Sequence, residues 1–146
     1  MHLTTHRNTT GRSLIGDEMR STPMLLWLYL LNAAVLITHE IDSAYWHEWE
    51  LFGIPGGIQV FLSLNIILVI VILYGHQALA LNRASGIVLS WVLVAGGLFA
   101  AAIHTFFLLQ GSEAFRLPAS LALIVSTFVL SLAQAAALLK ARRAAR

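Results

Sequence analysis

The chain contains no cysteine and few charged residues. Its cysteine count of 0 excludes disulfides, thiolate metal sites and cysteine nucleophiles, so that any metal would need His, carboxylate or amide ligands. Only 11% of the residues are charged and 58% are hydrophobic, and the mean hydropathy is +0.78. Ordinary soluble domains carry about a quarter charged residues. The composition therefore predicts a protein that uses lipid as its solvent.

Four apolar runs are long enough to cross a bilayer, which takes about 20 residues. They are Met24–Ile41, Gly57–Leu79, Ile87–Leu109 and Leu117–Leu139. Pro23 and Pro118 stand where helices would begin, and the segment around Pro55 is rich in glycine and breaks the chain before the second run. We expect an all-α, four-helix transmembrane bundle with an interfacial segment between helices 1 and 2.

The polar ends of the chain frame this bundle. Residues 1–22 are rich in Thr and Arg without the apolar core of a signal peptide, and we interpret them as a disordered tail. Met19 or Met24 is an alternative start of the chain. Residues 23–139 form the predicted four-span domain, and residues 140–146 a basic cytoplasmic tail.

Basic residues fall on one side of the predicted bundle. They precede the first run, separate the second from the third at Arg83, and follow the fourth run. By the positive-inside rule, this distribution places both termini in the cytoplasm, in the inner (plasma) membrane of the cell. It is the pattern of a topology signal, so we expect lipid and no nucleic acid as a partner.

The segment His39–Glu50, HEIDSAYWHEWE, is the densest in ionisable groups. It holds two histidines and four of the chain's 7 acidic residues, directly after the first apolar run. Ionisable groups at the edge of hydrocarbon are costly and tend to mark sites of function. The tyrosine and tryptophans of this segment favour the headgroup region, so we expect it to lie at the outer membrane interface.

Depth along the helices indicates which polar residues can meet. At 1.5 Å rise per residue, His39 lies near the outer end of the first span and His104 roughly 8 Å below the outer end of the third. A single outer site would combine these histidines with Glu40 or Asp42 and with Asn65, while His47, Glu48 or Glu50 fold over it. His76 lies too near the cytoplasmic side to join them.

The outer site has the residue types of a metal centre. His39 with Asp42 and His47 with Glu50 are pairs three residues apart, which share one face of a helix. Helical bundles supply ligands to di-iron and di-manganese centres at this spacing, and imidazole also suits zinc. We therefore predict a Zn, Fe or Mn site with His39, Asp42, His104 and His47 as candidate ligands. Glu40 or Glu50 would be the base that deprotonates bound water.

Each of these side chains has an alternative role. His39 and Asp42 can form a hydrogen-bonded pair at the membrane edge, and His47, Glu48 and Glu50 a solvated interfacial surface. His104 lies within a span, where an imidazole needs a partner.

The stretch from HEID to EWELFGIPGG resembles the characteristic sequence motif of an uncharacterised family of small bacterial multi-pass membrane proteins. The resemblance extends over about residues 23–139 and implies a four-helix membrane protein. It implies no activity and no catalytic residues.

Three functions remain open. The first is a membrane metal-binding protein, or a metalloenzyme acting on an apolar substrate. The second is a proton or cation carrier, whose path would need His76 as well as His104. The third is a non-catalytic scaffold or accessory subunit, which would bind another membrane protein or a second copy of the chain through small-residue faces.

Overall fold

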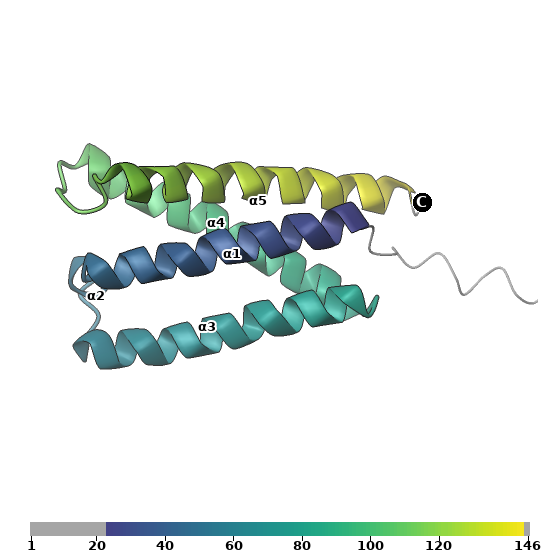
Figure 1. The fold of residues 1–146 in the computed structure, drawn as a ribbon, viewed down its shortest axis with the longest axis horizontal. Coiled ribbons are helices and arrows are strands. Elements are labelled where there is room, and N and C mark those ends of the chain that lie inside the picture. The colour runs from purple at the N-terminus through teal and green to yellow at the C-terminus, as the bar shows by residue number, and fades with distance from the viewer. Residues whose placement is uncertain (1–22, 145–146) are drawn as a thin grey trace, which may run out of the picture.

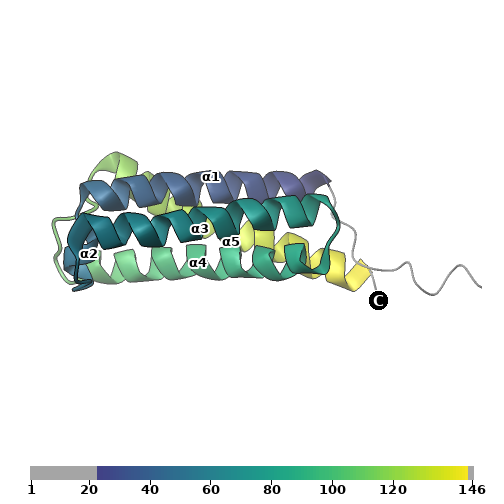
Figure 2. The same ribbon diagram turned by 90° about the horizontal axis from the view of Figure 1, so that it is seen from below.

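The computed structural model describes residues 23–144, all of whose regular elements are helices. The helices are α1 (Pro23–Tyr45), α2 (Glu48–Leu51), α3 (Gly57–Ala80), α4 (Ala84–Leu109) and α5 (Pro118–Ala144). Figures 1 and 2 show the four long helices side by side, with the short α2 at one end of the bundle. The predicted tail of residues 1–22 and the last residues of the basic tail lie outside the described part.

The four long helices confirm the predicted fold class. They contain 23, 24, 26 and 27 residues, and each is long and apolar enough to cross a membrane. Helix α1 continues past the predicted end of its apolar run at Ile41, so that Asp42 is helical as well as His39. Helix α5 likewise continues through Lys140 to Ala144. The division of the chain at residues 22 and 139 stays a prediction.

Local sequence accounts for the breaks between helices. Helices α1 and α5 begin at prolines, where the missing N–H costs no helical hydrogen bond. Gly53, Gly56 and Gly57 all have positive φ in the turn from α2 to α3, a conformation that glycine adopts without steric cost. Asn82 has φ 53° just after α3, where a left-handed residue ends a helix. These turns make the neighbouring long helices antiparallel.

The bundle has a polar interior. Helices α3 and α5 both pack against α1 and α4. Helix α3 nevertheless leaves most of its apolar side chains exposed. The buried polar side chains of the described residues all lie on α1, α4 and α5: Asn32, His39, Ser43, Ser90, His104, Ser120, Thr127, Ser131 and Gln134. In lipid, such groups join helices through hydrogen bonds.

One group of these residues ties three helices together at mid-depth. Asn32 Nδ2 donates hydrogen bonds to Gln134 Oε1 (2.9 Å) and Ser131 Oγ (3.2 Å), and Gln134 Nε2 donates to the carbonyl of Ser90 (3.4 Å). Gly97 lets α4 approach, because a Cβ there would collide with Ser131 Oγ. Of the other buried polar residues, Thr127 lies beside Gly97 and Ser131, and the rest lie at the α2 end.

Candidate functional site

Two histidines from different helices meet at the α2 end of the bundle. The rings of His39, on α1, and His104, on α4, have centroids 4.5 Å apart and planes at 75°, and each residue is only 1% exposed. His39 shares the inward face of α1 with Asn32, Leu36 and Ser43, which follow one another at helical spacing. The predicted meeting of these two histidines therefore occurs in the fold.

Asp42 is held by a chain of hydrogen bonds from α5. Ser120 Oγ donates to Asp42 Oδ1 (3.0 Å) and accepts from Trp46 Nε1 (3.2 Å). Asp42 lies one helical turn beyond His39 and is half-buried. A carboxylate that is oriented in this way keeps its second oxygen free for another partner.

Glu48, on α2, brings a second carboxylate to the histidines. Its Oε1 lies 3.6 Å from His104 Nε2, slightly beyond hydrogen-bonding distance, and its side chain is 13% exposed. Burial raises the pKa of Glu48, a nearby Ser43 hydroxyl opposes this shift, and the charge of Asp42 adds to it. We call His39, Asp42, Ser43, Glu48, His104 and Ser120 the α2-end cluster.

An aromatic side chain covers the cluster. The ring of Phe115, from the loop between α4 and α5, has its centroid 4.2 Å from that of His104 and 6.0 Å from that of His39. Phe115 is 1% exposed and has φ 63°. A left-handed backbone at a bulky residue is strained by about 1–3 kcal/mol, so the packing of this ring must hold it in place.

Several polar atoms of the cluster are left without partners. His39 Nδ1, His104 Nδ1 and Asp42 Oδ2 are buried and accept or donate no hydrogen bond. Buried polar atoms are nearly always paired, and exceptions call for a bound water, ion or ligand. The cluster therefore has buried atoms with free coordinating or hydrogen-bonding capacity.

The structure separates the predicted site residues into two sets. His39, Asp42 and His104 come together, and Glu40 is close enough to Glu48 for their charges to interact.

The other set lies apart from the cluster. His47 and Glu50 pair with each other at 3.8 Å, with side chains 61% and 70% exposed. His47 has φ 52°, and after this left-handed turn the Glu48 side chain lies inward while those of His47 and Glu50 stay exposed. His76 contacts Tyr29 instead, with ring centroids 5.6 Å apart. Asn65 Nδ2 bonds the carbonyl of its own helix at Phe61 (3.2 Å), and the Asn65 side chain also lies within hydrogen-bonding reach of Glu40, as predicted.

The side chains do not form a ready-made coordination sphere. Across residues 23–144, no three or more His, Asp or Glu groups stand in an arrangement that could hold a metal ion. The predicted metal site stays a prediction, and binding would require side chains of the cluster to rotate.

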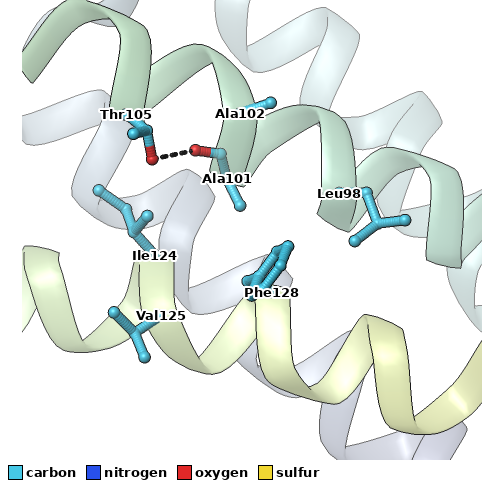
Figure 3. Close-up of a pocket in the computed structure, with 7 residues that line it drawn as sticks. All are labelled: Leu98, Ala101, Ala102, Thr105, Ile124, Val125 and Phe128. Carbon is cyan, nitrogen blue, oxygen red and sulfur yellow. Dashed lines mark hydrogen bonds between the residues drawn. The ribbon is translucent and has the colours of Figure 1, made fainter. Parts of the chain in front are cut away.

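An apolar groove lies beside the cluster, between α4 and α5. Its volume is about 350 Å³. Figure 3 shows the side chains that line it, Leu98, Ala101, Ala102, Thr105, Ile124, Val125 and Phe128. Ala101 and Ile124 are buried and pack with Phe115, the residue that covers the histidines. The groove and the cluster thus share a wall.

The chain belongs to a family of unknown function, DUF6713, whose model matches residues 25–141. No curated protein and no solved structure matches the chain. The match covers α3, α4, nearly all of α1 and α5, and the α2-end cluster. It confirms that the chain belongs to a family of unknown function and assigns no chemistry; that the family is bacterial and marked by the HEID and EWELFGIPGG motif stays a prediction.

Proposed function

We propose that this multi-pass membrane protein binds one divalent transition-metal ion in the α2-end cluster. His39, His104 and Glu48 are the proposed ligands, and Asp42 is available as a fourth. The observation that carries the proposal is the burial of two adjoining imidazoles, each with an unpartnered Nδ1, beside two carboxylates.

The ligand chemistry favours zinc, iron or manganese. Imidazole and carboxylate bind these ions, and catalytic zinc sites use three protein ligands and keep one position open. Coordination would also satisfy the buried nitrogen atoms of His39 and His104, whose burial without partners costs about 1–3 kcal/mol each. Rotation of the His39 and Glu48 side chains would complete the ligand set.

Surrounding residues would orient the ligands. Ser120 fixes one oxygen of Asp42, and the Phe115 ring packs on His104 and excludes water from it. Mutation of residues that orient metal ligands in this way typically lowers the metal affinity by about 10–100-fold.

A bound metal ion would supply a water of lowered pKa for attack on a substrate. Glu40, which lies beside Glu48, is our candidate for the base that takes the proton. The Glu50 side chain is exposed and pairs with His47, so we do not propose Glu50 as the base. A metalloenzyme acting on an apolar substrate is therefore the function we favour.

The distribution of charge supports an orientation with the cluster on the outer side. Arg83, Lys140, Arg142 and Arg143 all lie at the end of the bundle opposite α2. At the α2 end, the Arg116 guanidinium pairs with Glu113 at 3.4 Å. The positive-inside rule then places the termini in the cytoplasm of a cell whose inner membrane the chain spans.

Elemental analysis of the protein, purified in detergent without a histidine tag, tests the proposal. We expect close to one zinc, iron or manganese ion per chain, and loss of it in the His39→Ala, His104→Ala double variant. His76→Ala is the matched control, because it removes an imidazole from a span but not from the cluster. It should keep the metal.

Two outcomes would overturn the proposal. One is a wild-type protein that remains free of metal after incubation with each ion followed by desalting. The other is equal metal content in the double variant and the wild type. Metal-free protein that purifies with another membrane protein would favour an accessory subunit.

A further inference from the structure

The groove between α4 and α5 lies directly inward of the α2-end cluster. On α4, Leu98, Ala101 and Ala102 are roughly 3 to 9 Å further from the α2 end than His104, at 1.5 Å per residue. On α5, Ile124 to Phe128 are roughly 6 to 12 Å further from that end than Ser120. Thr105, which also lines the groove, follows His104 directly, so the groove extends from the depth of that histidine inward.

The wall of the groove offers nothing to a polar ligand. Alanines on α4 create the hollow, and the ring of Phe128 faces it from α5 (Figure 3). Its one hydroxyl, on Thr105, donates to the carbonyl of Ala101 at 2.7 Å. The groove therefore suits hydrocarbon, and the cluster suits the polar part of the same molecule.

We propose that the groove binds one hydrocarbon chain of a membrane lipid, with the ester region of that lipid beside the α2-end cluster. The lipid belongs to the leaflet on the α2 side, since its polar end then lies nearer the surface than its chain. This inference rests on the proposed function and names the substrate class of that site.

One small and one large side chain, Ala101 and Ile124, separate the groove from the histidines. Ala101 and Ile124 are 5% and 6% exposed, and both pack with Phe115. Because Ala101 carries only a methyl group, an ester that reaches this depth lies one side chain away from His104. A lipid in the groove would therefore approach the cluster from the membrane side, and its ester would contact His104 only after Phe115 or the Ala101–Ile124 wall moved.

Photo-crosslinking tests the proposal. The full chain is reconstituted in phosphatidylcholine vesicles that contain a minor fraction of phosphatidylcholine with a mid-chain diazirine. Cross-linked peptides are then quantified by mass spectrometry. We expect several-fold enrichment at Leu98–Thr105 and Val125–Phe128 over the lipid-facing residues of α3, such as Ile66 and Ile70, which are 62% and 61% exposed.

A matched pair of variants makes the test specific. Ala102→Phe fills the groove and should reduce cross-linking there several-fold. Ala95→Phe adds the same ring to the exposed side of α4, two helical turns away and outside the groove, and should leave cross-linking unchanged. Even labelling of all lipid-facing helices, or equal labelling of the two variants, would overturn the proposal.

The metal content of the same samples separates this inference from the proposed function. Ala102→Phe should retain its metal, because Ala102 is exposed on α4 and is not part of the cluster. Metal without groove labelling would contradict the lipid proposal alone. Groove labelling without metal would contradict the metal site and leave a lipid-binding protein.

Discussion

The hydroxyl of Ser120, on α5, donates a 3.0 Å hydrogen bond to Oδ1 of Asp42, on α1. This bond joins the first and last helices of the bundle next to the buried histidines. It also fixes which oxygen of Asp42 remains free, since Oδ2 has no partner. The orientation of a proposed metal ligand thus depends on a residue far away in the sequence.

Replacing Ser120 should weaken metal binding without removing a ligand. We expect Ser120→Ala to lower the affinity for zinc by about 10-fold, because Asp42 loses the donor that orients it. Competition with a chromophoric chelator measures this affinity. Ser63→Ala is the control, since the exposed Ser63 hydroxyl bonds only its own helix at Gln59 (2.9 Å). Equal affinities of the two variants would contradict the role of Ser120.

At Phe115, a glycine variant should be more stable than an alanine variant. Removing a buried phenylalanine ring costs about 3–5 kcal/mol, so both Phe115→Ala and Phe115→Gly should lower the melting temperature in detergent. Glycine should be the less harmful of the two, because φ is 63° and only glycine adopts this region freely. The exposed Phe106 supplies a control, and Phe106→Ala should have little effect. An alanine variant more stable than the glycine variant would argue against the left-handed backbone.

Glu48 should make the stability of the metal-free protein depend on pH. Burial raises its pKa above the ordinary value of 4.5, so the folded chain holds this proton more tightly than the unfolded chain. Stability should therefore fall as the pH rises from 4.5 through the raised pKa. Glu48→Gln mimics the protonated form and should be more stable than wild type at neutral pH, with the difference vanishing in acid.

Thermal unfolding with chelator present, over a series of pH values, measures this difference. Glu50→Gln is the control, because the Glu50 side chain is 70% exposed. A constant difference between Glu48→Gln and wild type at every pH would contradict the burial of the Glu48 carboxylate.

Neighbouring glycines on α4 should respond in opposite ways to alanine. Gly97→Ala should lower stability, because the new Cβ would collide with Ser131 Oγ where α4 meets α5. At Gly96 a Cβ meets nothing within 4 Å, so Gly96→Ala should leave stability unchanged or raise it by about 0.5–1 kcal/mol. Unfolding in detergent compares the two. Equal effects would contradict the close packing of these helices.

The sequence predicted the elements well because each depends on nearby residues. Length and hydropathy set the four spans, and proline and glycine set their breaks. Depth along the helices also predicted that His39 and His104 could meet, since the bundle is up-and-down and both lie near one end. These inferences needed no knowledge of side-chain packing.

The rest of the site depends on turns and on contacts between distant helices. Nothing in the pattern of carboxylates indicated that, after a left-handed residue at His47, Glu48 would lie inward and Glu50 outside. Ser120 and Phe115 went unnoticed because neither is ionisable, and their roles arise from the packing of the α4–α5 loop and α5 on α1. A serine two residues after Pro118, at the depth of Asp42, was the available signal for the first of them.

X-ray absorption at the zinc edge tests the central claim most directly. Zinc-loaded wild-type protein should show nitrogen and oxygen ligands at about 2.0–2.1 Å, with the outer-shell scattering of two imidazoles. The His39→Ala, His104→Ala double variant should lose this imidazole scattering, while His76→Ala should keep it. A zinc spectrum without imidazole scattering, or one that is unchanged in the double variant, would contradict a metal site in the α2-end cluster.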